Sequence, residues 1–248
     1  MRARFGSRAY LEAGSGPNTI VLLHGIGSRA FSWATQLDRW SNRFRIIAWD
    51  APGYGNSEDI PNQEPDANDY ADALADFLDA LELERPLLVG HSLGALIAGT
   101  FASRFSSKAA ALVLLSVACG YGHLSLVDRE RRFAPRAGDL RALGAEGLAS
   151  RRSAALLSDH ATPEQVARVG DAMKTVRESG YLAALRMLTN ADLLAVAPKI
   201  ALPTLVACGS EDAVTPPDQN RRVAQAVPGA AFALVEGAGH ALYVERPD

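Results

Sequence analysis

The sequence predicts an α/β fold in which a mostly parallel, doubly wound sheet is interrupted by an inserted helical segment. Two observations predict the sheet. Short apolar runs bounded by turn residues recur along the chain, and amphipathic helical patterns lie between them. Apolar runs of this length without polar alternation are typical of parallel strands that are covered on both faces. A third observation, the lack of any such run over residues 118–190, predicts the insertion.

The predicted strands are rich in Val, Ile and Leu, and they are Thr19–Leu23, Arg45–Trp49, Pro86–Val89, Ala110–Val117, Thr204–Cys208 and Ala231–Val235. One helical pattern precedes the third of them, and its apolar face holds Tyr70, Leu74, Phe77, Leu78 and Leu81. Acidic residues near its start, Asp66, Asp69 and Asp72, suit a helix N-terminus. Strands that alternate with helices indicate right-handed parallel crossovers.

The strand-free stretch is too long for a simple connection, because loops in α/β folds usually have about 2–6 residues. We therefore predict a core formed by residues 1–117 and 191–248, with a helical cap at 118–190. The cap holds 11 Arg and Lys against 8 Asp and Glu, a net charge of +3, so the core carries −6. A solvated helical face explains these charges most simply. A lid whose arginines favour an anionic substrate is the second interpretation.

Composition excludes several classes of protein. A hydrophobic fraction of 48% is too high for a disordered chain, and a net charge of −3 gives no basic field for nucleic acid. The longest apolar stretches are far shorter than a membrane span, and the N-terminus resembles no secretory signal. Cys119 and Cys208 form neither a metal motif nor a disulfide framework. We expect a cytoplasmic protein without nucleic-acid or membrane partners, and its oligomeric state is left open.

The most specific chemical signal is the run from Val89 to Gly94, which reads Val-Gly-His-Ser-Leu-Gly. It matches the pattern Gly-x-Ser-x-Gly between a predicted strand and a predicted helix, where a sharp turn exposes the serine. Gly90 and Gly94 are the small neighbours that such a turn requires. Ser92 is therefore the predicted nucleophile.

A serine hydroxyl needs a base, and the base needs an orienting carboxylate. His240 follows the last predicted strand in a loop of small residues, which favours it over the other four histidines. Asp212 and Glu211 both lie just past a strand end, and the shorter Asp212 is preferred. Asp128 is the fallback. The order Ser, acid, His along the chain agrees with this choice.

The developing oxyanion needs hydrogen-bond donors. Residues 24–27 read His-Gly-Ile-Gly at the end of the first predicted strand, and glycines let backbone N–H groups turn inward. We expect the N–H groups of Ile26 and Leu93 to form the oxyanion hole. His24 is expected to hold this loop rather than to act in catalysis.

These motifs together resemble the α/β-hydrolase fold superfamily, in particular its compact bacterial branch of esterases, lactonases, cofactor-free haloperoxidases and carbon–carbon bond hydrolases. The resemblance also covers the turn Asp50–Ser57, the segment Gly209–Asp212 and the pair Gly239-His240. It implies Ser92, Asp212 and His240 as a triad, and a helical cap after the sixth strand. The family usually has a leading hairpin, expected here to be shortened, and a helix after its Glu-Arg-Pro segment, where this sequence stops.

The predicted function is a serine hydrolase that cleaves small carboxylic esters or lactones through an acyl-serine, with no metal or organic cofactor. One alternative is a carbon–carbon bond hydrolase of anionic ring-fission dienoates, although Ala241 stands where compared enzymes tend to carry tryptophan. Others are a cofactor-free haloperoxidase or perhydrolase and, in a different class, a ligand receptor that retains the triad. Ser92 argues against epoxide hydrolases and dehalogenases, which use aspartate at that position.

Substrate contacts are the least specified part of the prediction. Aromatic and apolar side chains dominate small-molecule pockets. On that basis Trp33, Tyr121 and Val214 are the first candidates for substrate binding. The wider set adds residues of the loop after Gly25 and of the cap, namely Ser28, Phe31, Phe133, Tyr181, Leu182 and Met187.

Overall fold

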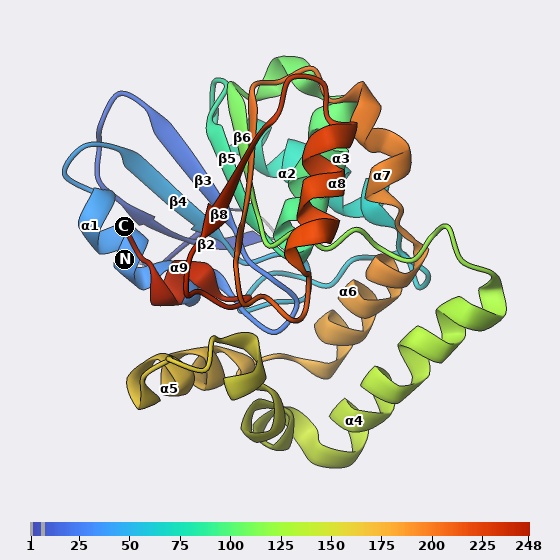
Figure 1. The fold of residues 1–248 in the computed structure, drawn as a ribbon. Coiled ribbons are helices and arrows are strands. Elements are labelled where there is room, and N and C mark those ends of the chain that lie inside the picture. Colours follow the sequence, from blue (N-terminus) through green and yellow to red (C-terminus); the bar gives the residue numbers. More distant parts are fainter. Residues whose placement is uncertain (1, 6–7) are drawn as a thin grey trace.

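The computed structural model describes residues 2–5 and 8–248, and its strands form one sheet (Figure 1). The order across the sheet is β1-β2-β4-β3-β5-β6-β7-β8. β1 and β2 are antiparallel to their neighbours, and all later pairs are parallel. The predicted fold class is thereby confirmed. The strands are β1 (Arg2–Phe5), β2 (Arg8–Ala13), β3 (Thr19–Leu23), β4 (Arg45–Trp49), β5 (Leu87–His91), β6 (Ala111–Leu115), β7 (Thr204–Gly209) and β8 (Ala231–Val235).

Helices cover both faces of this sheet. Alternate residues of β3 face opposite cores: Val21 belongs to the core that includes side chains of α2, α3, α7 and α8, whereas Leu22 belongs to the core that includes side chains of α1 and α9. The helices are α1 (Ala34–Trp40), α2 (Ala67–Ala80), α3 (Leu93–Arg104), α4 (Leu126–Arg152), α5 (Pro163–Met173), α6 (Glu178–Asn190), α7 (Leu193–Val196), α8 (Pro217–Ala226) and α9 (Leu242–Glu245). No described helix is both long enough and apolar enough to cross a membrane.

The start of α2 shows how the sequence sets local structure. Asp66 is the N-cap, and its carboxylate accepts hydrogen bonds from the backbone N–H groups of Asn68 and Asp69. The Asp69 carboxylate in turn accepts from the N–H of Asp66, which completes a capping box. Two of the three acidic residues expected at this N-terminus, Asp66 and Asp69, therefore act through specific hydrogen bonds, whereas Asp72 forms a salt bridge with Arg104. The leading hairpin, expected to be shortened, is present as β1 and β2.

Between β6 and β7 the described chain contains helices and no strand, as expected for residues 118–190. α4, α5 and α6 group together on one side of the molecule (Figure 1). Together with the loop of His240, they line one pocket with Ser92. Their role as a cap stays a prediction.

The helix α4 spans 27 residues, but it is bent at Gly144. There the backbone has φ 65° and ψ −179°, a conformation that is almost exclusive to glycine. A straight helix would separate Arg136 from Arg152 by about 24 Å. Because of the bend, both arginines reach the same pocket.

Alanine substitutions at two glycines of α4 are predicted to change the free energy of unfolding in opposite directions. A Cβ at either Gly138 or Gly144 would meet nothing within 4 Å, so only the backbone distinguishes them. Gly144→Ala should lower the free energy of unfolding by about 1–3 kcal/mol because of its positive φ. Gly138→Ala, inside the helix, should raise it by about 0.5–1 kcal/mol. Urea denaturation measures both, and an increase for Gly144→Ala would contradict the bend.

Candidate active site

Ser92 lies at the sharp turn between β5 and α3. Its φ of 55° and ψ of −111° are strained for a residue with a side chain, at a cost of about 1–3 kcal/mol. The turn is fastened on both sides, because the N–H of Ser92 donates to Leu115 O at 2.8 Å and its carbonyl accepts from the N–H groups of Ala95 and Leu96. This conformation directs the serine side chain into a pocket.

The two glycines of the motif are required by close backbone contacts. A Cβ at Gly90 would lie 2.4 Å from the carbonyl oxygen of Gly94. A Cβ at Gly94 would lie 2.2 Å from the carbonyl oxygen of Leu23. Real Cβ atoms do not approach oxygen so closely, so glycine at both positions permits the turn and the contact between α3 and β3.

His240 and Asp212 are paired in the interior. Nδ1 of His240 lies 3.0 Å and 3.1 Å from the two carboxylate oxygens of Asp212, and both residues are buried. The Thr215 hydroxyl donates to Asp212 at 2.8 Å and lies 3.1 Å from the same Nδ1. An ionised carboxylate only accepts hydrogen bonds, so Nδ1 carries the proton and Nε2 of the neutral ring is a free base.

Asp212 stays ionised although it is buried. Burial by itself would raise its pKa. The hydrogen bond from His240, the positive charge that this ring carries when it is protonated, and two hydrogen bonds from Thr215 outweigh that effect and lower the pKa to about 2. The N–H of Val214 donates to the same carboxylate at 2.9 Å. Asp212 is therefore a fixed negative charge behind the His240 ring.

His91 supports His240 from the other side. Its Nε2 donates to the backbone carbonyl of His240 at 2.8 Å, and its ring packs against the rings of His240 and Tyr243 with centroids 4.8 Å apart in each pair. Its Nδ1 is buried without a hydrogen-bond partner. Burial, followed by the charge of His240, lowers the pKa of His91 to about 3, so its ring is neutral.

The lowered pKa of His91 predicts acid sensitivity. In the unfolded chain the His91 ring becomes protonated at about pH 6.5, whereas in the folded protein it stays neutral until about pH 3. The free energy of unfolding should therefore fall as the pH drops below 6.5, by up to about 1.4 kcal/mol per pH unit from this group. His91→Gln keeps a donor but cannot titrate. Urea unfolding from pH 7 to 4 should show a shallower decline for this variant, and identical slopes would contradict the assignment.

The loop after β3 borders the serine from the opposite side. A Cβ at Gly25 would lie 3.3 Å from the Cβ of Ser92. His24 holds this loop: its Nδ1 donates to Gly25 O at 2.8 Å, and its Nε2 accepts from the N–H of Ala51 at 3.0 Å. The carbonyl of Ile26 accepts from the Tyr54 hydroxyl at 2.6 Å. The N–H groups of Ile26 and Leu93 donate to no described residue, and their role as an oxyanion hole stays a prediction.

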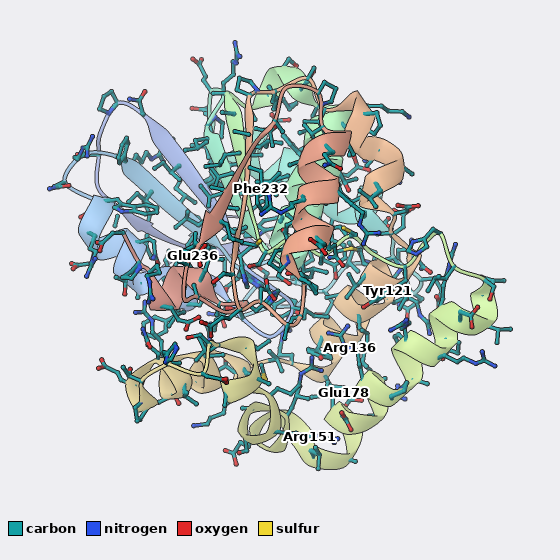
Figure 2. The ribbon with its side chains drawn as sticks, in the orientation of Figure 1. Tyr121, Arg136, Arg151, Glu178, Phe232 and Glu236 are labelled. Atoms are coloured by element: carbon teal, nitrogen blue, oxygen red, sulfur yellow. The ribbon has the colours of Figure 1, made fainter. Side chains whose placement is uncertain are left out.

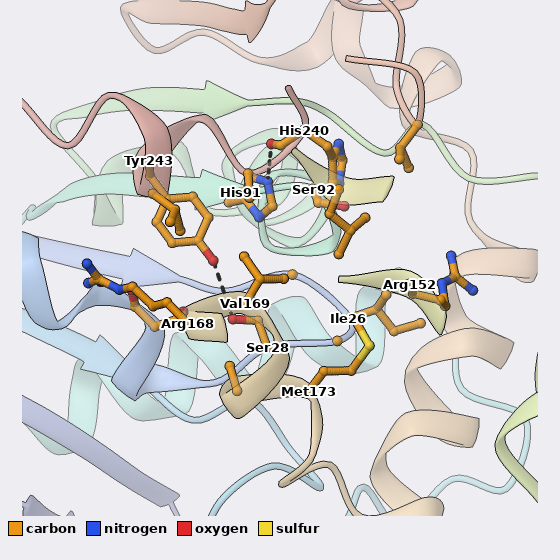
Figure 3. Close-up of a pocket in the computed structure, with 18 of the residues that line it drawn as sticks. Ile26, Ser28, His91, Ser92, Arg152, Arg168, Val169, Met173, His240 and Tyr243 are labelled. Carbon is orange, nitrogen blue, oxygen red and sulfur yellow. Dashed lines mark hydrogen bonds between the residues drawn. The ribbon is translucent and has the colours of Figure 1, made fainter. Parts of the chain in front are cut away.

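One pocket contains most of these groups (Figure 3). Ser92 and His240 line it together, as do Ile26 and Val214 of the predicted site. Ser28 and Tyr181 from the wider set line it too. Asp212 lies behind His240 and does not line the pocket. No group of three or more His, Cys, Asp or Glu side chains in the described part of the chain could hold a metal ion.

Two predicted substrate contacts are placed elsewhere. Trp33 is 1% exposed and packs on the Tyr243 ring at 4.3 Å, beside a different groove on the face of the sheet covered by α1. Tyr121 lies under the guanidinium of Arg132, in a depression near Cys119. Both were chosen because they are aromatic, and in both the ring serves packing. Neither lines the pocket of Ser92.

The alternative catalytic candidates do not line the pocket of Ser92. Glu211 is exposed, and Asp128 bonds to Ser125 and Arg131 at the start of α4. His123 and His160 are exposed as well.

Sequence analysis missed several residues that complete the pocket. Three are arginines from α4 and α5, namely Arg136, Arg152 and Arg168. In the sequence, Arg136 and Arg152 stand out only as members of a basic stretch, and Arg168 does not stand out at all. Helical periodicity does not show which arginine points inward when a helix is bent. Met173 and Tyr243 complete the apolar wall. Their spacing carried no recognisable motif.

Glu245 was also missed, and it fastens the His240 loop. Its buried carboxylate accepts from the N–H of Gly239 at 2.7 Å and from the N–H and hydroxyl of Ser158 at 3.0 Å and 2.5 Å. In addition, the N–H of Ala241 donates to Leu156 O at 2.8 Å. The segment between α4 and α5 is thereby tied to both neighbours of His240.

Comparison with known proteins shows the family to which the chain belongs. The alpha/beta hydrolase fold family matches residues 18–247. A pimeloyl-[acyl-carrier protein] methyl ester esterase of Chromobacterium violaceum is 30% identical over 241 residues, which cover 94% of this chain and 91% of the esterase.

Two solved structures are similar over the whole chain. The enol-lactonase of Burkholderia xenovorans LB400 has a TM-score of 0.86 and 26% identity, covering 100% of this chain and 95% of the lactonase. A thermophilic esterase of Thermogutta terrifontis has a TM-score of 0.87 and 26% identity, covering 100% of this chain and 94% of the esterase. The protein therefore belongs to the alpha/beta hydrolase fold family.

Proposed function

We propose that the protein is a serine hydrolase of small carboxylic esters or lactones, with Ser92 as nucleophile, His240 as base and Asp212 as orienting carboxylate. The carrying observation is that His240, which is joined to buried Asp212 at 3.0 Å, lines one pocket with a serine held in a strained turn. Figure 3 shows Ser92 and His240 on the same side of that pocket. Ester and lactone substrates are supported by the similarity of the chain to two esterases and an enol-lactonase.

In the acylation step Nε2 of His240 takes the hydroxyl proton of Ser92 while Oγ attacks the ester carbonyl carbon. A C–O bond forms, and the carbonyl π electrons move onto the oxygen. When the tetrahedral intermediate collapses, the bond to the alcohol oxygen breaks and the imidazolium returns its proton to the leaving alkoxide. Asp212 stabilises the imidazolium between these transfers without becoming protonated, which agrees with its pKa of about 2.

In the deacylation step a water molecule gives a proton to His240 and attacks the acyl carbon. Collapse of the second intermediate breaks the C–Oγ bond, and the proton returns to Ser92 as the acid leaves. The backbone N–H groups of Ile26 and Leu93 would bind the oxyanion in both intermediates. Leu93 is the first residue of α3, so its N–H has no partner within the helix. One such donor contributes about 100–1000-fold in rate.

Residues 118–190 would act as the cap that selects the substrate. They supply pocket walls from α4, α5 and α6, and the contacts of Ser158 and Leu156 connect them to the His240 loop. Val214 would contact the substrate from the loop of Asp212.

Turnover of a panel of p-nitrophenyl esters and lactones of increasing acyl length tests the proposed function. An esterase releases many equivalents of p-nitrophenol per protein molecule at a steady rate. A receptor that retains the triad would release one equivalent, slowly, and keep the acyl group. Stoichiometric release, or no release from any ester or lactone, would contradict the proposal.

A further inference from the structure

The arginines of residues 118–190 fall into two groups. Most have a partner within the protein. Five form salt bridges with acidic side chains, namely Arg131, Arg141, Arg151, Arg177 and Arg186. Arg129 donates to the carbonyls of Gly122 and Leu124, Arg132 stacks over the Tyr121 ring, and Arg168 donates to the carbonyl of Ser32. For these residues a solvated or paired surface is a sufficient explanation.

Arg136 and Arg152 form the second group. Neither makes a hydrogen bond or a salt bridge to a described residue, and both side chains line the pocket of Ser92. The Nε of Arg136 is buried without a partner. Figure 2 shows Arg136 where α4 faces α6, and Figure 3 shows Arg152 at the border of the pocket. A buried N–H without an acceptor is costly, so such groups normally have a ligand, a water or an ion as partner.

The two guanidinium groups also act on each other. Burial first, and then the positive charge of Arg136, lower the pKa of Arg152. The carboxylate of Asp139, which favours the charged form, is bound to Arg151 at 2.9 Å. The described lining of the pocket holds three arginines and no Asp or Glu. The pocket therefore carries positive charge that the protein itself leaves uncompensated.

We propose that Arg136 and Arg152 together bind a carboxylate carried by the substrate, so that the enzyme acts on anionic esters or lactones of dicarboxylic acids. This inference rests on the proposed function, because it names the substrate class of the same site. A carboxylate offers two oxygens, and each guanidinium presents planar N–H donors that fit them. The third arginine, Arg168, donates to Ser32 O at 3.4 Å and is not part of the pair.

The pocket supplies the remaining parts of such a site. Val169, Met173 and Tyr181 give an apolar wall for the carbon chain between the carboxylate and the reacting carbonyl. The bend at Gly144 brings the two arginines, which are 16 positions apart on α4, to one place. The site thus explains both the unusual backbone of α4 and the two unpaired cations.

Equilibrium binding tests the inference without turnover. In the Ser92→Ala background, monomethyl glutarate and the uncharged dimethyl glutarate are compared by titration calorimetry. We expect the hemiester to bind at least tenfold more tightly, and Arg136→Met or Arg152→Met to weaken it by about 10–100-fold. Arg141→Met removes a paired charge from the same helix and should leave hemiester binding unchanged. Equal affinities for the two esters, or no saturable binding of the hemiester at millimolar concentration, would overturn the inference.

Kinetics separates this inference from the proposed function. The probes are p-nitrophenyl hydrogen glutarate and methyl p-nitrophenyl glutarate, which differ only in the distal charge. The ratio of their kcat/KM values should favour the anionic ester at least tenfold and fall toward one in Arg136→Met/Arg152→Met. Rapid Ser92-dependent turnover of both esters with a ratio near one would refute the carboxylate site and leave the esterase standing. Arginine-dependent hemiester binding without hydrolysis of any ester would refute the esterase instead.

Discussion

Ser92→Ala should lower kcat for a p-nitrophenyl ester by about 10⁴-fold or more, because removal of the nucleophile leaves only binding and the oxyanion donors. The fold should survive. The Ser92 side chain makes no hydrogen bond to a described residue, and the backbone hydrogen bonds of the turn do not involve it. The thermal unfolding midpoint should therefore stay close to that of the wild type. Retention of more than a few per cent of the activity would exclude Ser92 as nucleophile.

Ser116 gives a matched control for this variant. It follows the neighbouring strand β6, is fully buried and has a positive φ of 48°, much as Ser92 has 55° after β5. Its hydroxyl has no hydrogen-bond partner, and it does not line the pocket. Ser116→Ala should keep the activity. An equal loss of activity in both variants would indicate that disturbance of the carboxyl ends of β5 and β6, rather than loss of the nucleophile, is responsible.

Asp212→Asn should lower kcat by about 10⁴-fold while substrate binding changes little. The variant keeps the volume of the side chain but removes the charge that stabilises the imidazolium. Its amide also allows the tautomer in which Nε2 carries the proton and cannot accept one from Ser92. Steady-state kinetics at neutral pH measures the loss. A decrease of less than tenfold would remove Asp212 from the proposed mechanism.

Glu211→Gln is the control for the same loop. The residue precedes Asp212 but is exposed, and it was the competing acidic candidate in the sequence. We expect activity within about twofold of the wild type, because an exposed charge is screened by solvent. A loss of activity comparable to that of Asp212→Asn would indicate that Glu211, rather than Asp212, is the carboxylate that orients His240.

The sheet was predictable because its signals are local. Runs such as Thr19–Leu23 and Arg45–Trp49 coincide with the observed strands β3 and β4, since an interior strand covered on both faces must be mostly apolar. The elbow was predictable for a similar reason. Gly90 and Gly94 are required within a few residues of Ser92 by direct backbone contacts.

The pocket walls were not predictable, because they depend on long-range placement. Trp33 and Tyr121 were expected at the substrate and instead pack elsewhere. Arg136 and Arg152 reach the pocket only because Gly144 adopts a positive φ, which the sequence does not reveal in a stretch containing other glycines. Glu245 contacts Ser158 from 87 positions away, a separation that no local pattern reports.

The proposed mechanism requires a covalent bond between Ser92 and the acyl group of the substrate. Labelling with a fluorophosphonate, followed by peptide mass spectrometry, tests this directly, because the reagent reacts with a serine only when an adjacent base activates it. We predict one label per chain on the peptide that contains Ser92, loss of esterase activity in proportion to labelling, and no label in Ser92→Ala. Full esterase activity after complete labelling of Ser92, or the label on another residue in the active protein, would contradict the account.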